Sequence, residues 1–115
     1  MKIFITGVAG FLGSHLADLM LSQGHTVAGN DNMIGGYSDN VPQDVEFHQV
    51  DCCDLENLTK AMEGCDIVYH TAATAYEGLS VFSPVLVTRN IFEASVTTIT
   101  AAIRNKVKRI VYCSS

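Results

Sequence analysis

The stretch TGVAGFLG, residues 6–13, places glycines at positions 7, 10 and 13. It follows a short apolar run at residues 3–5, which predicts a buried strand. Apolar side chains then recur at the spacing of one face of a helix, and Gly24 is a suitable stop; they are Leu12, Leu16, Leu19 and Met20. The three glycines therefore stand where a predicted strand gives way to a predicted helix.

Glycines at this spacing favour a phosphate site at the start of the helix. The first turn of a helix has unpaired N–H groups and a partial positive charge, and both attract phosphate. Gly7 allows a sharp turn off the strand, Gly10 allows the backbone to approach a pyrophosphate, and Gly13 allows the helix to pack closely. A tight strand–helix turn without a ligand is the alternative. The position at the start of a βαβ unit favours the dinucleotide site.

The rest of the chain alternates between predicted strands and helices. A polar loop is expected at residues 31–42. Helices are expected at 55–62 and from 84 to about 105, and further strands at 26–30, 45–50, 66–70 and 109–113. Strands joined by helices form parallel sheets covered on both faces, so the sequence predicts a doubly wound α/β domain of about five strands.

The two later helices have recognisable ends. Asp54 is expected to cap the shorter helix, and Gly64 follows its end. Ser83 is a cap followed by Pro84 in the first turn of the longer helix. Much of the apolar stripe of that longer helix is expected to come from Val85, Ile91, Val96, Ile99 and Ile103.

The composition excludes several classes of function. The 115 residues carry a net charge of −5 with only seven Lys and Arg, which argues against nucleic acid as a partner. No apolar run approaches the roughly 20 residues of a membrane span, and a predicted strand begins directly after Met1, so neither a membrane segment nor a secretory leader is expected. The four cysteines form no C-x-x-C pair, so we expect a cytoplasmic protein with reduced thiols and no metal site.

Asp31 is the second candidate for cofactor binding. It stands at the end of the second predicted strand, where a carboxylate can accept both hydroxyls of an adenosine ribose and would repel a 2′-phosphate. No Lys or Arg follows in the loop to attract such a phosphate. An Asx-type turn in Asn30-Asp31-Asn32 is the alternative interpretation. The sequence therefore favours NAD over NADP.

Residues 6–16, TGVAGFLGSHL, resemble the fingerprint T-G-x-x-G-F-[IL]-G-S-[HN]-L of the extended short-chain dehydrogenase/reductase superfamily. That group includes the NAD-dependent nucleotide-sugar epimerases and dehydratases. The resemblance continues in register at residues 31–32, 50–55, 68–73 and 107–115. It implies a Rossmann-like fold, NAD as cofactor, and a nucleotide sugar as substrate of the parent enzyme.

The resemblance also implies roles for individual residues. Asp51 would bind the adenine amino group, and Cys52 would contribute through its backbone. Ser115 matches the Ser or Thr that hydrogen-bonds the reacting hydroxyl, whereas His70 has no catalytic role in the family. The implied cofactor-binding residues are Gly7, Gly10, Phe11, Leu12, Gly13, Asp31, Asn32, Asp51, Cys52, Ala72, Ala73 and Thr74.

The chain departs from the family pattern in two places. The helix before the last strand usually carries N-x-x-G-[ST], with its Asn near the nicotinamide side. Here residues 90–95, NIFEAS, lack the Gly, and Asn90 is about one residue out of step with Ala101 and Ala102. In the second strand, Gly29 and Asn30 are less apolar than a buried parallel strand prefers.

The family's catalytic pair, Y-x-x-x-K, has no match in these residues. Tyr37, Tyr69 and Tyr76 are followed four residues later by Val41, Ala73 and Ser80, and Tyr112 lies three residues from the end. We therefore expect residues 1–115 to be the N-terminal part of an NAD-binding domain, without the Tyr-Lys segment and the substrate lobe. Such a chain would bind NAD without turnover; a non-catalytic dinucleotide-binding or redox-sensing module is the alternative. Apolar area left exposed would favour homo-oligomers or other self-association.

Overall fold

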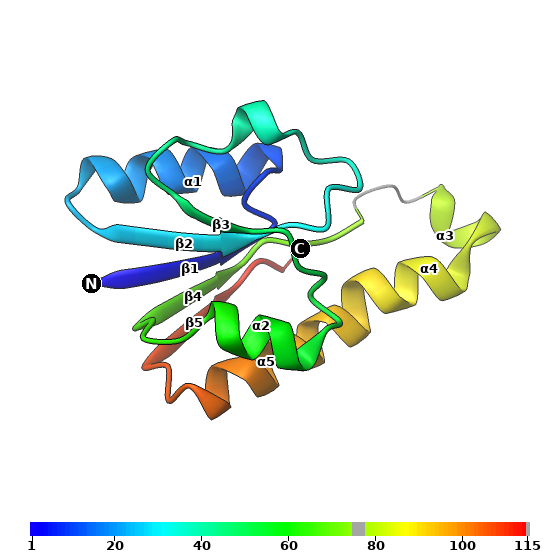
Figure 1. Ribbon diagram of the computed structural model, residues 1–115. Coiled ribbons are helices and arrows are strands. Elements are labelled where there is room, and N and C mark those ends of the chain that lie inside the picture. Colours follow the sequence, from blue (N-terminus) through cyan, green and yellow to red (C-terminus); the bar gives the residue numbers. More distant parts are fainter. Residues whose placement is uncertain (75–77, 115) are drawn as a thin grey trace.

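A computed structural model of the chain describes residues 1–74 and 78–114. In that part of the chain a parallel sheet runs in the order β3-β2-β1-β4-β5 (Figure 1). Its strands are β1 (Lys2–Thr6), β2 (Thr26–Asn30), β3 (Glu46–His48), β4 (Ile67–His70) and β5 (Arg109–Tyr112). The order reverses after β1, as in a doubly wound, Rossmann-like fold, so the predicted fold class is confirmed. Strand β3 is shorter than the strand predicted at residues 45–50.

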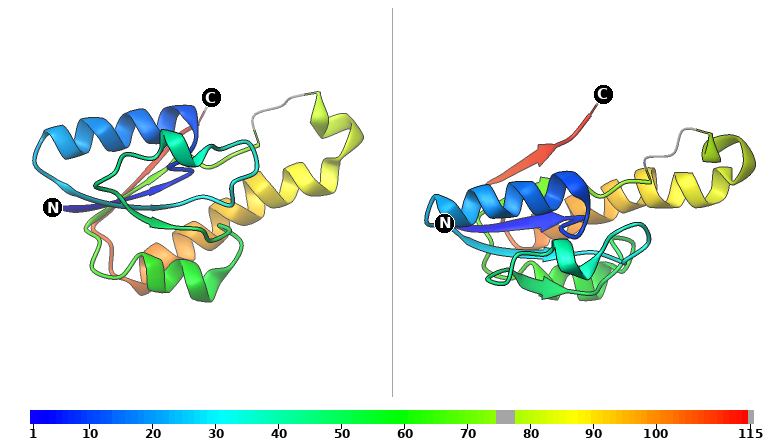
Figure 2. Two further views of the ribbon diagram at one scale, coloured as in Figure 1. Left: turned by 45° about the horizontal axis from the view of Figure 1, so that its top comes forward. Right: turned by 90° about the horizontal axis from the view of Figure 1, so that it is seen from above.

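The helices cover both faces of the sheet. Helix α1 (Phe11–Ser22) lies on one face, and α2 (Leu55–Ala61) and α5 (Ala94–Arg104) lie on the other (Figure 1). Between β4 and α5 the chain forms α3 (Leu79–Phe82), α4 (Pro84–Thr88) and a π-helical turn, η2 (Arg89–Glu93). The α3 and α4 segment projects away from the sheet in all views (Figure 2). The sequence did not predict α3, nor the 3₁₀ turn η1 (Ser38–Asn40).

Small residues bring α1 close to its face of the sheet. Gly13, Ser14 and Ala17 are buried, and the core on this side also contains Ile3, Ile5, Val8 and Val27. Leu16 and Met20 pack against the edge of that core, as their spacing predicted. Leu12 and Leu19, however, are about half exposed. The apolar stripe predicted from the sequence therefore coincides only in part with the buried face of α1, because the helix meets the sheet through its smallest side chains.

The second core lies between the sheet and the pair α2 and α5. Phe4, Ala28 and Val68 of the strands pack against Leu58 and Met62 of α2 and its C-terminal end. Ala101 and Ala102 of α5 complete this cluster. Fully burying a side chain such as Phe4 or Leu58 contributes roughly 1.5–3 kcal/mol. This core fixes α2 and α5 relative to the strands.

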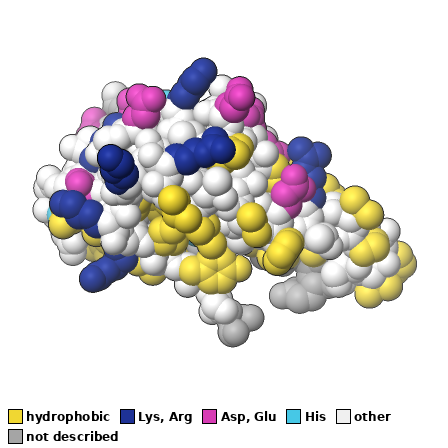
Figure 3. Space-filling view, turned by 90° about the horizontal axis from the view of Figure 1, so that it is seen from below, with side chains coloured by type: hydrophobic (Ala, Val, Ile, Leu, Met, Phe, Trp, Pro, Cys, Tyr) yellow, Lys and Arg dark blue, Asp and Glu magenta, His cyan; other side chains and the backbone are white. Residues whose placement is uncertain are grey.

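The stripe predicted for the long helix does not face the core. Val85 is 82% exposed and Ile103 is 71% exposed, and the other members are at least one third exposed. The buried residues of α5 are instead Ala94, Thr98, Ala101 and Ala102. Figure 3, which views the molecule from below, shows hydrophobic side chains gathered on this face and around the projecting α3 and α4 segment. The bulky stripe faces outward because small side chains let α5 approach the sheet.

Candidate functional site

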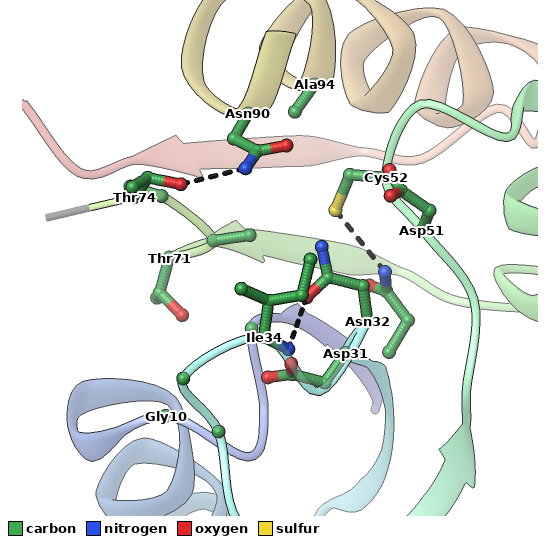
Figure 4. A pocket seen from close by; sticks show the side chains of 16 residues that line it. Gly10, Asp31, Asn32, Ile34, Asp51, Cys52, Thr71, Thr74, Asn90 and Ala94 are labelled. Atoms are coloured by element: carbon green, nitrogen blue, oxygen red, sulfur yellow. Dashed lines mark hydrogen bonds between the residues drawn. The ribbon is translucent and has the colours of Figure 1, made fainter. Parts of the chain in front are cut away.

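A pocket of about 120 Å³ opens beyond the carboxyl ends of β1, β2 and β4. Parallel α/β sheets bind ligands at this edge, next to the position where the strand order reverses. The pocket is lined by most of the residues implied in cofactor binding: Gly7, Gly10, Asp31, Asn32, Asp51, Cys52, Ala72, Ala73 and Thr74. The chain thus brings together side chains that are far apart in the sequence (Figure 4).

The glycine turn forms the part of the pocket at the start of α1. Gly7 has φ +70°, and a Cβ there would lie 2.9 Å from the Cα of Ala72. Gly10 is the N-cap residue of α1, and no side chain caps the helix or places a carboxylate in its first turn. No side chain of the helix itself therefore occupies the first-turn N–H groups at the positive end of its dipole. This arrangement suits a phosphate group.

Gly13 has a packing role beneath that turn. A Cβ at Gly13 would overlap the carbonyl oxygen of Gly7 and lie 3.0 Å from the Cα of Val8. The helix can therefore begin directly against the turn only because this residue has no side chain. Of the other residues implied by the motif, Phe11 is 82% exposed and Leu12 is 53% exposed, and neither lines the pocket.

Asp31 is nearly buried at the end of β2, with both carboxylate oxygens engaged. Oδ2 accepts a hydrogen bond from Ala9 N at 3.1 Å, and Oδ1 accepts one from Met33 N at 2.8 Å. The second bond is the Asx-type contact, so the two interpretations of this residue are compatible. Each oxygen can accept more than one hydrogen bond, so the carboxylate keeps capacity for hydroxyl groups.

Gly36 closes the loop over this carboxylate. Its missing Cβ would lie 3.1 Å from Asp31 Oδ1 and 3.0 Å from the Cβ of Ala9. A side chain here would press on both neighbours, and glycine leaves the rim of the pocket open beside Asp31. No sequence pattern indicates this contact, because it depends on how the loop folds back.

Asp51 and Cys52 form a further part of the pocket. Asp51 Oδ1 accepts a hydrogen bond from Cys53 N at 2.8 Å, and Asp54 caps α2 through Asn57 N at 3.3 Å, as predicted. Burial raises the pKa of the Cys52 thiol to about 11. The thiol is therefore protonated at neutral pH and is a small packing group rather than a nucleophile.

The two residues of β2 that are unusual for a buried strand, Gly29 and Asn30, are explained by their neighbours. Asn30 is buried, and its Nδ2 donates to Val50 O at 2.8 Å and to Cys52 Sγ at 3.3 Å. A Cβ at Gly29 would lie 2.6 Å from Ile5 O and 2.8 Å from the Cβ of Val8. Both residues thus serve the packing of the strand against the glycine turn and the loop after β3.

Asn90 lines the opposite side of the pocket from Asp31, and its Nδ2 donates to Thr74 Oγ1 at 2.9 Å (Figure 4). The sequence placed Asn90 one residue out of step, and the π-helical turn at residues 89–93 is the reason that it still reaches the pocket. A π turn holds one more residue than an α turn. Residues before it therefore face the directions that residues one position later would face in a regular α-helix. The sequence signals for this residue were its partial match to the Asn of N-x-x-G-[ST] and the irregular spacing.

Other expectations fall outside the site. Ser115 lies outside the described residues. Within residues 1–74 and 78–114, the four cysteines are free, and no three His, Cys, Asp or Glu side chains are grouped to hold a metal ion. In the same part of the chain, no helix is both long enough and apolar enough to cross a membrane.

Comparison with known proteins agrees with this geometry. Residues 3–115 match the NAD dependent epimerase/dehydratase family. UDP-glucose 4-epimerase from Caenorhabditis elegans is 34% identical over 132 residues, covering 100% of this chain and 38% of that protein. The solved UDP-glucose 4-epimerase from Thermotoga maritima, with UDP-glucose, has a TM-score of 0.96 and 28% identity over 100% of this chain and 38% of its own. The UDP-glucose 4-epimerase from Thermus thermophilus, in complex with NAD, has a TM-score of 0.94 and 34% identity at the same coverage.

This chain therefore spans a little over one third of the length of these relatives, at 38%. The match extends over the glycine turn, Asp31 and the loop after β4, so it includes every part of the pocket. The resemblance drawn from the motifs is confirmed: the chain belongs to the NAD-dependent epimerase/dehydratase family.

Proposed function

We propose that residues 1–115 form the N-terminal part of the NAD-binding domain of a nucleotide-sugar epimerase or dehydratase in the cytoplasm. The observation that carries the proposal is the uncapped N-terminus of α1 beside the buried Asp31. One attracts the pyrophosphate of a dinucleotide, and the other accepts hydroxyls of its ribose. A solved relative has NAD bound, and another has UDP-glucose bound.

The pocket suggests where each part of NAD would be held. The pyrophosphate would lie against Gly7 and Gly10 at the start of α1, and the adenosine ribose against Asp31. The adenine would lie beside Asp51 and the backbone of Cys52. The small residues at 72–74 leave room for the chain of phosphates and riboses, and Asn90 would face the nicotinamide side.

Bound NAD would supply a hydride acceptor that oxidises a ring carbon of the sugar and then returns the hydride. The chain's own part is to hold and orient that cofactor. Because none of its four tyrosines begins a Y-x-x-x-K, we expect these 115 residues by themselves to bind NAD without turnover. The nucleotide-sugar substrate belongs to the parent enzyme.

Calorimetric titration of the chain with NAD and with NADP tests this function. Asp31→Asn keeps an oxygen for Met33 N, loses the bond from Ala9 N and removes the charge, so we expect NAD binding to weaken about 10- to 100-fold, the effect of losing hydrogen bonds to a charged group. The same variant should narrow the preference for NAD over NADP. Asp39→Asn, in the exposed turn η1, is the matched control and should bind like the wild type. Folded protein that binds neither dinucleotide, or prefers NADP, would contradict the proposal.

A further inference from the structure

A buried hydrogen-bond chain connects the pocket with α5. Thr6, the last residue of β1, accepts hydrogen bonds at Oγ1 from the backbone N–H groups of Thr71 and Ala72, at 3.1 and 3.2 Å. The same oxygen lies 2.7 Å from Nδ1 of His70. The other ring nitrogen, Nε2, lies 3.1 Å from Ser95 Oγ. His70 is thus the middle link between the loop after β4 and the first turn of α5.

The contacts determine where the His70 proton lies. A hydroxyl oxygen has two acceptor positions, and Thr71 and Ala72 occupy both on Thr6. The Thr6 hydroxyl must therefore donate to Nδ1, which leaves the ring proton on Nε2. That proton faces Ser95 Oγ, whose own hydrogen is donated to Ile91 O. The chain of donors is consistent only for a neutral His70 protonated on Nε2.

The surroundings of the ring also favour its neutral form. His70 is 4% exposed, and burial lowers its pKa below the ordinary value. The groups that face it are the hydroxyls of Thr6 and Ser95 and the ring of Tyr112, which stacks at 5.6 Å. Among the described residues no charged side chain contributes to the shift, so desolvation is its cause.

We propose that neutral His70, with its proton on Nε2, is a positioning residue that holds the two sides of the pocket together and thereby sets the affinity for the dinucleotide. On one side it orients Thr6, which fixes Ala72 against Gly7 in the wall of the pocket. On the other side it fixes Ser95, which is adjacent to the pocket residue Ala94 and bonds the π turn that contains Asn90. This inference rests on the proposed binding of NAD.

Protonation of His70 would break the chain at a defined atom. A second ring proton would appear on Nδ1 and face Thr6 Oγ1, which already accepts two hydrogen bonds. Thr6 would then release Thr71 N or Ala72 N, and the pocket wall would loosen. Because the folded-state pKa of His70 is lowered, the neutral ring contributes fully to the free energy of unfolding above its unfolded pKa of about 6.5. That contribution is lost progressively as the pH falls below this value.

The first experiment measures the state of the ring without a ligand. Nitrogen-15 NMR of the four imidazoles distinguishes the two neutral tautomers, and a titration gives the pKa of each. We expect His70 to be the Nε2–H tautomer and to titrate below the ordinary value. An Nδ1–H tautomer, or an unshifted or raised pKa, overturns the inference whether or not the chain binds NAD.

The second experiment measures NAD affinity by calorimetry at pH 8 and at about one pH unit below the pKa that the NMR titration gives for His70. Wild-type affinity should fall about fivefold or more at the lower pH, the usual effect of one lost hydrogen bond. His70→Asn retains an acceptor near Thr6, and His70→Gln retains a donor near Ser95; each should bind about fivefold more weakly at pH 8 and lose the pH dependence. His25→Asn, at the residue before β2, is the control and should retain both the affinity and its pH dependence.

The outcomes separate the two proposals. Wild-type protein that does not bind NAD at pH 8 contradicts the proposed function, and the NMR result then decides the inference alone. Protein that binds NAD equally at both pH values, with His70 variants unchanged, overturns the inference and leaves the function standing. Circular dichroism at each pH confirms that folded protein is compared.

Discussion

The two sides of the pocket are built in different ways. The side formed by β1, α1 and β2 comes from one short βαβ unit, and the atoms that meet Gly7 and Gly13 or donate to the Asp31 carboxylate are mostly backbone atoms. The side formed by Thr74 and Asn90 depends on a hydrogen bond between the loop after β4 and a π turn, on a helix whose bulky residues face outward. The first side is specified locally by the sequence, whereas the second depends on how distant segments pack.

This difference predicts unequal sensitivity to mutation. On the glycine side the nearest neighbours of Gly7 and Gly13 are backbone atoms, which cannot move aside without disturbing a strand or helix. On the Asn90 side the contacts are single hydrogen bonds between side chains, each worth about 1 kcal/mol. Damage to the first side should therefore affect folding, and damage to the second should affect mainly binding.

The largest effect is expected for Gly13→Ala. The new methyl group would overlap the Gly7 carbonyl oxygen, so we expect a loss of roughly 3 kcal/mol or more in the free energy of unfolding. Gly78→Ala is the matched control on the other side, because a Cβ there meets nothing within 4 Å and its φ is negative. Thermal and urea unfolding measure both variants. Equal stability of the two would contradict the comparison.

An intermediate effect is expected for the pair Asn90 and Thr74. Asn90→Ala and Thr74→Val should each weaken NAD binding about fivefold, by removing one hydrogen bond, while stability changes little. The double variant should bind no more weakly than either single one, because the two residues share that bond. Calorimetry on the three proteins measures the coupling.

Ile91→Ala tests the π turn in the same assay. In an uninterrupted α-helix counted back from Ala94, Ile91 would take the place toward the pocket that Asn90 occupies here. We expect its replacement to leave NAD affinity unchanged. A loss as large as that of Asn90→Ala would show that the helix phase is different.

The smallest effect on stability is expected for the outward stripe. Val85→Lys and Ile103→Lys place charges at positions that are 82% and 71% exposed, so the free energy of unfolding should change by no more than about 0.5 kcal/mol. We propose that this apolar surface promotes self-association, so both variants should reduce it. Sedimentation velocity over a range of concentrations measures it. A wild-type chain that stays monomeric throughout would refute that role for the stripe.

Sequence reasoning worked best where a residue's neighbours are close in the chain. Gly7 and Gly13 could be assigned because strand, turn and helix follow one another directly, and Asp54 because a cap contacts its own helix. The face that α5 buries could not be predicted. Its bulky residues have the periodicity of a core stripe, but the small residues Ala94 and Ala101 allow a closer approach to the sheet.

Contacts between distant segments could not be predicted from the sequence pattern. The closeness of Gly36 to Asp31 depends on the path of a loop, and the link between Thr6, His70 and Ser95 joins three separate elements. The polar residues of β2 looked like departures from a strand until Val8 and Val50 were placed beside them. Such residues carry no short-range signal, so only the packed structure relates them.

The π turn at residues 89–93 has a consequence for evolution within this family. A helix can absorb the insertion of one residue as a local widening, and every side chain on the far side of the insertion keeps its direction. Residue-by-residue matching across this helix would then pair functional positions wrongly, and the gap belongs inside the helix rather than in a loop. Deleting one of residues 91–93 should restore a regular helix and leave Asn90 facing Thr74, because Asn90 would then stand three residues before Ala94.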